Sequence, residues 1–203
     1  MPSGTDISST VGRDQQLQSI HSLLTKTANR EGGSLLFSGE PGIGKSHLLR
    51  EATACAKALS IRVISLRCSE SDINEPFALF SRIGALFDIP EPASLHTDAA
   101  RFLYGRKTLD AIAQHPSIIL IDDLQWCDYL SSIALLHLFD YGTNLGIGFL
   151  ATTRPLDDFD ETGTIIQVRT LSQLMTHVPL TGLSKVETSQ LVSQVTSTSV
   201  TPS

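Results

Sequence analysis

The chain has 203 residues, 41% of them hydrophobic and 18% charged, with a formal net charge of −6, which suits one α/β domain with a buried core. The acidic balance and the lack of a segment rich in lysine and arginine argue against direct binding of nucleic acid, which needs clustered basic residues. No apolar run approaches the length of a membrane span and no signal-peptide pattern begins the chain, so we expect a cytoplasmic protein without membrane contact.

The first predicted elements surround a glycine-rich loop. Residues 1–10 are small and polar, and we expect them to form a disordered lead-in. Apolar residues at helical spacing predict a helix that begins at 11–14 and ends near 30–33. A short apolar strand over 35–37 follows, and a second helical pattern runs from the loop to about residue 59. The glycine-rich loop therefore joins a strand to a helix.

This loop, Gly39–Ser46, matches the phosphate-binding pattern of Gly, any four residues, Gly-Lys-Ser/Thr. Its glycines leave the backbone bare, so that a polyphosphate can lie against N–H groups at the start of a helix. Lys45 can reach the β- and γ-phosphates of ATP, and the Ser46 hydroxyl can hold Mg²⁺. The alternative is a loop that merely joins two elements. We expect the nucleotide to contact Gly39, Glu40, Pro41, Gly42, Ile43, Gly44, Lys45, Ser46 and His47.

The middle of the chain continues the alternation of strands and helices. β-Branched residues over 61–66 predict a second strand, followed by a polar loop over 68–75. Two helical patterns follow, over 77–87 and 99–113. The aromatic stripe of the first could line an adenine pocket, but we expect it to pack against the sheet.

An apolar run that ends in two acidic residues supplies the second half of the candidate site. Residues 117–121 form a continuous apolar run, typical of a strand buried on both faces, and Asp122 and Asp123 follow it. Mg²⁺ keeps most of its waters and needs only a carboxylate near Ser46, so we assign Asp122 to the metal, mostly through water. Asp123 can orient or deprotonate the water that attacks the γ-phosphate. The alternative is that two acidic residues simply end a strand.

The last third of the chain places an arginine beyond another strand. Arg154 follows the strand predicted over 148–152, where its guanidinium can form a fork with γ-phosphate oxygens and distinguish ATP from ADP. Trp126 could stack on a base, but we expect it to pack locally. The remaining predicted elements are a helix over 131–145, an acidic loop over 157–161, a helix over 165–175, a strand over 177–180, a helix opened by a capping box at Ser184–Glu187, and a disordered Ser/Thr tail over 196–203.

Strands that alternate with helices predict the α/β fold of a P-loop NTPase, a three-layer α/β/α sandwich with a parallel five-stranded sheet, spanning 11–195. Ligands bind at the carboxyl ends of such strands, so the loop glycines, Asp122, Asp123 and Arg154 should meet at one edge. A GTPase is disfavoured because no Asn-Lys-x-Asp segment occurs. A dinucleotide oxidoreductase is disfavoured because the third glycine of its fingerprint is missing. A small-molecule kinase remains an alternative, although no acceptor site is suggested.

Four segments together resemble the ATPase module of the signal-transduction ATPases with numerous domains, within the wider AAA+ group. They are Val11-Gly12-Arg13, the loop 39–46, the run 118–126 that ends in Asp-Asp-Leu-Gln-Trp, and the strand end 150–154. The resemblance covers roughly residues 10–195 and is strongest to the module of large ATP-binding regulators of the LuxR family. It implies the strand order 5-1-4-3-2, Val11, Gly12 and Arg13 near the adenine, and Arg154 as the sensor of the γ-phosphate. Gln16 departs from the acidic residue often found there.

The resemblance also implies a function, namely a regulatory switch that binds ATP and Mg²⁺ and hydrolyses ATP slowly. The helical lid of this group would begin near Leu183, so we expect a truncated lid. A protein partner or a second copy would then complete the site. The alternative is a non-catalytic nucleotide-binding or protein-interaction fragment.

Overall fold

The computed structural model describes residues 11–92, 95, 97–155 and 163–198. The predicted lead-in over 1–10, the acidic loop over 157–161 and the end of the Ser/Thr tail lie outside the described residues. The elements in chain order are α1 (Asp14–Ala28), β1 (Gly33–Ser38), α2 (Lys45–Ala58), β2 (Arg62–Arg67), the 3₁₀ helix η1 (Glu70–Asn74), α3 (Ala78–Ala85), α4 (Asp98–Ile112), β3 (Ser117–Asp122), the 3₁₀ helix η2 (Leu124–Trp126), α5 (Tyr129–Asn144), β4 (Gly148–Thr153), α6 (Gly163–Leu174), β5 (Thr176–Pro179) and α7 (Lys185–Thr198).

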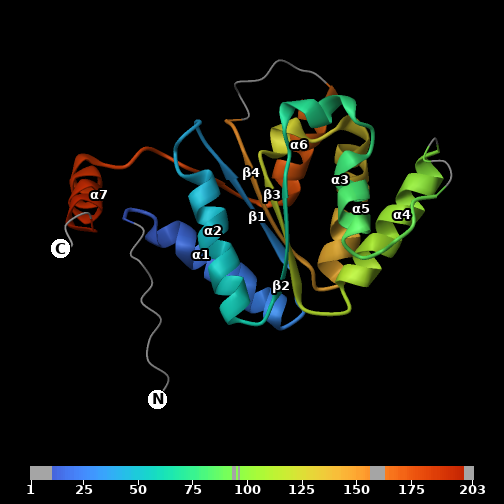
Figure 1. Ribbon diagram of the computed structural model, residues 1–203, viewed down its shortest axis with the longest axis horizontal. Helices are drawn as coiled ribbons and strands as arrows, with labels where there is room; N and C mark the ends of the chain where they lie inside the picture. The colour runs from blue at the N-terminus through green and yellow to red at the C-terminus, as the bar shows by residue number, and fades with distance from the viewer. Residues whose placement is uncertain (1–10, 93–94, 96, 156–162, 199–203) are drawn as a thin grey trace, which may run out of the picture.

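The five strands form one parallel sheet in the order β2-β3-β4-β1-β5 (Figure 1). Read from the other edge, this is the predicted order 5-1-4-3-2, and the predicted fold class is confirmed. The register pairs Ser38 with Thr153, and Arg67 with Asp122. The carboxyl ends of β1, β2, β3 and β4 are therefore level, which brings the loops that follow them together.

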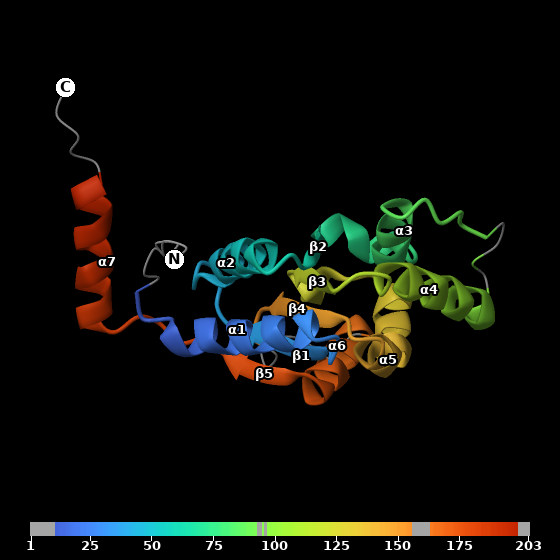
Figure 2. The ribbon, with the colours of Figure 1, turned by 90° about the horizontal axis from the view of Figure 1, so that it is seen from below.

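Helices cover both faces of the sheet, as Figures 1 and 2 show. Leu35 and Phe37 of β1 pack in the cluster that includes α1 and α2, whereas Leu36 packs in the cluster of α3, α4, α5 and α6. This alternation follows from the two-residue period of side chains along a strand. Because both sides of the central strands are buried, β3 and β4 have almost no polar side chains before their last residues.

The aromatic stripe of α3 packs inside the second of these clusters, as predicted. Phe77, Phe80 and Ile83 are buried, and the rings of Phe77 and Phe80 stack with their centroids 5.3 Å apart. The sheet and α4 cover this stripe, so it lines no nucleotide pocket.

Two segments differ from the sequence-based expectation. The region predicted as a polar loop contains η1, whose first turn is closed by a capping box between Ser69 and Asp72. Helix α7 runs to Thr198, so the first three residues predicted as disordered tail are helical. The capping box predicted at the start of α7 is present, because the Ser184 N–H donates to Glu187 Oε2 at 2.6 Å.

One buried carboxylate caps two helices on the α3 side of the sheet. Asp128, which is 1% exposed, accepts hydrogen bonds from the N–H groups of Phe77 at 2.7 Å and Ser131 at 2.8 Å. The first lies at the beginning of α3 and the second in the first turn of α5. Both helix N-termini therefore converge on Asp128, the second residue after η2.

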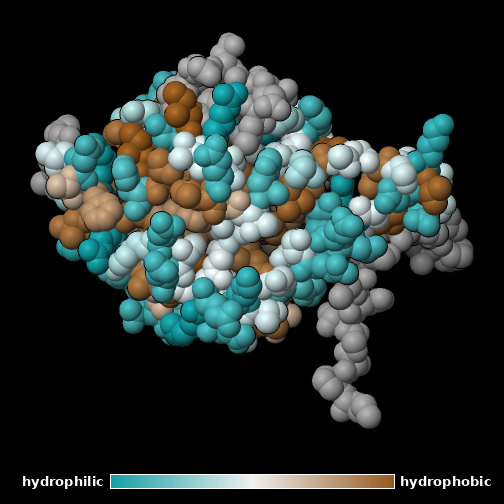
Figure 3. Space-filling view, turned by 180° about the vertical axis from the view of Figure 1, so that it is seen from behind, coloured by the Kyte–Doolittle hydropathy of each residue, from teal (hydrophilic) through white to brown (hydrophobic). Residues whose placement is uncertain are grey.

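Helix α7 projects from one end of the α/β body (Figure 2), and its N-terminal residues lie beside Gly12. Seen from behind, apolar side chains gather on the half of the body away from α7 (Figure 3). Helix α6 contributes Ile166 and Leu174 to the exposed apolar residues. None of the described helices has the length and apolar character that crossing a membrane requires.

Candidate nucleotide-binding site

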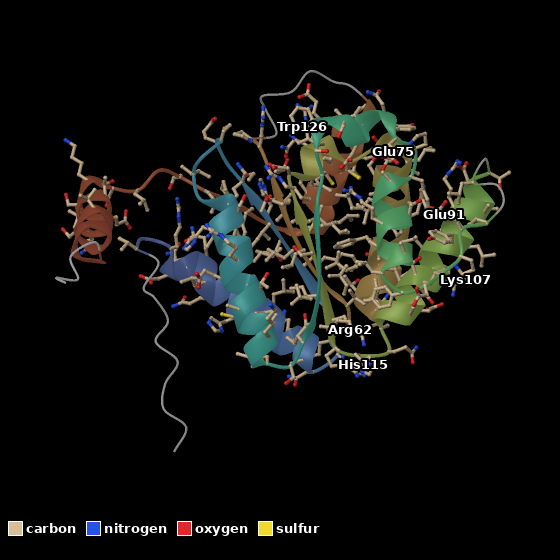
Figure 4. The ribbon with its side chains drawn as sticks, in the orientation of Figure 1. Arg62, Glu75, Glu91, Lys107, His115 and Trp126 are labelled. Atoms are coloured by element: carbon tan, nitrogen blue, oxygen red, sulfur yellow. The ribbon has the colours of Figure 1, made fainter. Side chains whose placement is uncertain are left out.

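The candidate residues lie together at the carboxyl ends of the strands. Trp126, just past β3, lies at this end (Figure 4). Arg62 begins β2 and His115 precedes β3, and both lie at the opposite end. The loop after β1 is joined to β4 by the Gly39 N–H, which donates to the Thr153 carbonyl at 3.2 Å. The level strand ends thus hold the loop, the acidic pair and Arg154 in one region.

The backbone of the phosphate loop needs glycine at two positions. Gly42 and Gly44 have φ angles of +80° and +105°, in the left-handed region that L-residues with side chains avoid. A Cβ at either position would meet no atom within 4 Å, so the space beside the loop is open. Gly44 is also the N-cap of α2, whose first N–H groups therefore face that space. A phosphate fits this arrangement of bare backbone at a helix N-terminus.

Lys45 is buried in the loop and bound to its backbone. Its Nζ donates to the carbonyls of Gly39 at 2.5 Å and Glu40 at 2.9 Å. Burial lowers the pKa of Lys45 from its ordinary value of 10.5, while the nearby carboxylates of Asp123 and Asp122 oppose that shift. Three of the groups that shift this pKa carry a charge opposite to that of the ammonium, namely Asp122, Asp123 and Glu40.

A chain of hydrogen bonds joins α2, β3 and β4. Ser46 Oγ donates to Asp122 Oδ2 at 2.8 Å, and Thr152 Oγ1 donates to Asp122 Oδ1 at 2.5 Å. Thr152 Oγ1 in turn accepts from the Asp123 N–H at 3.0 Å. A hydroxyl and a carboxylate in contact at the edge of an exposed loop suit Mg²⁺, which takes one or two protein oxygens and otherwise waters and phosphate oxygens. Ser46 and Asp122 would hold the ion.

The side chain of Asp123 takes no part in this chain of hydrogen bonds and has other partners. Its backbone is in the left-handed region, with φ 58° and ψ 48°, which turns the chain directly after β3. Asp123 Oδ2 lies 3.4 Å from a guanidinium nitrogen of Arg67, and Asp123 Oδ1 accepts from Gln125 Nε2 at 3.2 Å. The two carboxylates of the acidic pair therefore have separate partners.

Arg154 lies over Trp126, with its guanidinium carbon 5.1 Å from the ring centroid. This distance is typical of a cation–π interaction, which holds the guanidinium against the indole. The contact also identifies the partner of Trp126, which we expected to pack locally. The Arg154 N–H donates to Gln125 Oε1 at 3.2 Å.

Of the residues expected near the adenine, Gly12 lies beside the start of α7 and Arg13 contacts the phosphate loop. Gly12 has a φ of +71°, and a Cβ there would clash with Glu187 and Leu183 at the start of α7. The buried guanidinium of Arg13 donates to the carbonyls of Ile43 at 2.9 Å and Thr181 at 3.0 Å. Arg13 therefore ties the phosphate loop to the segment between β5 and α7. Its guanidinium is already committed to backbone carbonyls.

The family described as "AAA ATPase domain" matches residues 9–147, which include the loop, the acidic pair and most of the sheet. The chain belongs to this AAA ATPase domain family. A comparison with curated proteins gave no match.

Three of the solved structures that resemble this AAA ATPase domain are those of Orc1, Cdc6p and DnaA proteins. Orc1 of Aeropyrum pernix, in complex with DNA, has a TM-score of 0.64 and 14% identity over 95% of this chain and 51% of its own. Cdc6p of Pyrobaculum aerophilum has a TM-score of 0.61 and 16% identity over 98% and 52%. AMPPCP-bound DnaA of Aquifex aeolicus has a TM-score of 0.58 and 18% identity over 95% and 54%. At these identities the likeness shows the fold, and the AAA ATPase domain spans about half the length of each.

Sequence reasoning missed three residues of the site in this AAA ATPase domain. Thr152 and Arg67 lie at the ends of β4 and β2, so the strand-end rule that found Arg154 could have found them. Gln125 stood inside the quoted Asp-Asp-Leu-Gln-Trp segment, but no periodicity indicated that it turns inward. His47 was expected to contact the nucleotide. Its Nε2 lies 3.8 Å from Oε1 of Glu51, one helical turn further along α2.

Proposed function

We propose that this AAA ATPase domain is the ATP-dependent switch of a regulator of the signal-transduction type, that it binds ATP with Mg²⁺, and that it hydrolyses ATP slowly. The observation that carries the proposal is the 2.8 Å hydrogen bond between Ser46 and Asp122. It joins the phosphate loop to the strand-end carboxylate, which is where a nucleotide-bound Mg²⁺ needs its two protein oxygens. Arg154 beyond the neighbouring strand supports the switch role, since a guanidinium there can recognise the γ-phosphate.

Each predicted residue has a role in this proposal. The loop from Gly39 to His47 holds the phosphates, and Val11, Gly12 and Arg13 lie near the adenine. Ser46 and Asp122 hold Mg²⁺, which would neutralise phosphate charge. We propose a core over residues 11–195 that works in the cytoplasm, with no membrane contact.

Hydrolysis is proposed to proceed by in-line attack of water on the γ-phosphorus. The water oxygen bonds to phosphorus, and the bond from phosphorus to the β–γ bridging oxygen breaks, giving ADP and inorganic phosphate. Asp123 accepts the proton of the attacking water. Lys45 and Arg154 stabilise the charge that develops on the phosphoryl oxygens and on the leaving group.

The openness of the site supports a role for a partner. Pro41, Gly42 and Ser46 are exposed, and the Arg67 side chain is 75% exposed. Water reaches such a site freely, which weakens electrostatic stabilisation, so we propose that a protein partner or a second copy covers it. The structure of DnaA with AMPPCP supports ATP as the ligand. The Orc1 structure contains DNA, but the net charge of −6 favours no direct nucleic-acid binding by this segment.

The alternative is a domain that binds ATP without hydrolysing it, which the same exposure favours. Single-turnover cleavage of radiolabelled ATP, compared with ATP retention on a filter, separates the two. We expect cleavage, with steady-state turnover far below the enzyme median of about 10 s⁻¹. Turnover per molecule should rise with protein concentration if a second copy covers the site. Retention of intact ATP over many hours would leave only the binding role.

A further inference from the structure

Gln125 is the one side chain of the segment after β3 that contacts both the acidic pair and the strand end carrying Arg154. It is 3% exposed and lies in η2, between Asp123 and the start of α5. Its Nε2 donates to Asp123 Oδ1 at 3.2 Å, and its Oε1 accepts from the Arg154 N–H at 3.2 Å. A single amide thus connects Asp123 with Arg154, to which the proposed hydrolysis gives different roles.

The chemistry of the two partners fixes the orientation of this amide. A carboxylate only accepts hydrogen bonds, and a backbone N–H only donates. Turning the amide over would place its oxygen against the carboxylate and its NH₂ group against the N–H. Both contacts would then be repulsive in a buried place, where unpaired polar groups are costly. The bridge is therefore specific to a side chain with one donor and one acceptor at this reach.

The other partner of Asp123 cannot fix the carboxylate in the same way. Arg67 reaches Asp123 Oδ2 at 3.4 Å, and its side chain is 75% exposed. Solvent screens such an exposed ion pair, and the flexible arginine leaves it easily. Gln125, by contrast, is buried and belongs to a turn whose backbone begins with the left-handed residue Asp123. The bond from Gln125 is the one that sets the direction of the carboxylate.

The bridge joins the two residues that are proposed to act at the γ-phosphate, the general base Asp123 and the sensor Arg154. Thr152 already ties the end of β4 to Asp122 and to the Asp123 backbone. Gln125 adds a link from the Asp123 side chain to the Arg154 backbone, and the Arg154 guanidinium lies over the adjacent Trp126. Because the bond is to the Arg154 backbone, a shift of the backbone at the end of β4 would move the amide that holds Asp123.

We infer that Gln125 is a positioning residue that orients Asp123 for its role in hydrolysis and couples that orientation to the position of Arg154. The inference rests on the proposed ATPase function and adds a residue to it. Gln125 touches neither phosphate nor water in this role. It acts through Asp123 and Arg154.

The experiment compares Gln125→Asn and Gln125→Met with the wild-type protein. Asparagine keeps the same amide but is one methylene shorter, so it cannot reach both partners; methionine keeps the length and removes both bonds. We expect kcat to fall at least tenfold in both, as befits a misdirected general base. The dissociation constant for ADP should stay within twofold of the wild-type value. Gln114→Asn, at an exposed glutamine, is the control and should leave kcat within twofold. Wild-type kcat in Gln125→Asn would overturn the inference.

A double substitution shows whether Gln125 acts through Asp123. In a protein that already carries Asp123→Asn, adding Gln125→Met should change the residual rate by less than twofold, because the carboxylate to be oriented is gone. A further tenfold loss would contradict the positioning role and assign Gln125 a separate one.

Trp126 supplies a readout that needs no turnover, since it is the single tryptophan of the chain. In the nucleotide-free protein its emission reports the Arg154 contact, and Arg154→Ala gives the reference for the loss of that contact. We expect the emission of Gln125→Asn to move toward this reference. Emission identical to wild type would remove the Arg154 half of the inference. A wild-type protein that binds ATP but does not cleave it would end the proposed hydrolysis, while the emission would still test the bridge.

Discussion

Ser46 Oγ donates a 2.8 Å hydrogen bond to Asp122 Oδ2 across 76 positions of the chain. The bond places the first turn of α2 against the end of β3, two elements that the parallel sheet brings to the same edge. Both groups are exposed enough to exchange this contact for a metal ion, because Ser46 is exposed and Asp122 is only half-buried. The fold itself therefore brings the hydroxyl and the carboxylate of the candidate site together.

Replacing Lys45 by alanine should strongly weaken nucleotide binding while the fold is retained. The ammonium contacts backbone carbonyls of its own loop. A charge-assisted contact with phosphate contributes about 1.5–3 kcal/mol, so we expect about a ten- to hundredfold loss of affinity. Calorimetric titration with a non-hydrolysable ATP analogue measures it, with circular dichroism as the control for folding. Unchanged affinity would remove Lys45 from the site.

The two acidic residues should separate by role. Asp122→Asn should weaken binding of ATP in the presence of Mg²⁺ but not in its absence, because Asp122 contacts the Ser46 hydroxyl at the proposed metal position. Asp123→Asn should leave binding nearly intact and lower kcat by about a hundredfold or more, since only the transition state needs the base. Titrations with and without Mg²⁺, together with single-turnover assays, compare them. Wild-type cleavage by Asp123→Asn would show that another group activates the water.

Arg154→Ala should narrow the preference for ATP over ADP. The guanidinium is proposed to meet only the γ-phosphate, so ADP affinity should not change. A tenfold loss for ATP corresponds to about 1.4 kcal/mol. Competition between the two nucleotides for a fluorescent ADP analogue gives the ratio directly. Equal losses for both would show that the contact of Arg154 with Trp126 supports the structure rather than recognition.

Lys45 should also give the nucleotide-free protein a pH-dependent stability. Because burial lowers its pKa below 10.5, the unfolded chain holds this proton more tightly than the folded protein does. The free energy of unfolding should therefore rise with pH between the folded pKa and 10.5. Lys45→Met lacks this effect. We expect the free energy of unfolding of Lys45→Met, relative to that of the wild-type protein, to fall as the pH rises toward 10.5.

Urea denaturation of the two proteins at a series of pH values measures this difference. The contributions of titrating groups that both proteins share cancel in the comparison. Lys57→Met removes an exposed lysine from the same helix and serves as the control. A relative free energy of unfolding of Lys45→Met that rises toward pH 10.5 would have the opposite sign and would contradict the role of burial.

The parts of the site that are contiguous in sequence could be predicted, and those that depend on neighbouring strands could not. The loop 39–46 carries its own spacing, and Asp122 ends an apolar run, so both are visible in the chain. The contact of Thr152 with Asp122 depends on how β4 is registered against β3, which no local pattern reveals. Gln125 turns inward because Asp123 adopts a left-handed backbone, a conformation uncommon for a residue other than glycine. The strand order followed from the resemblance and was confirmed by the sheet.

The carboxylate of Asp128 links the local stability of α3 to that of α5. It accepts from the beginning of α3 and from the first turn of α5, so neither helix can fray at that end without leaving a buried acceptor or donor unpaired. The two helices should thus open together as one cooperative unit. Amide hydrogen exchange would then give the same opening free energy for the first turns of both, and Asp128→Ala would release them as a pair.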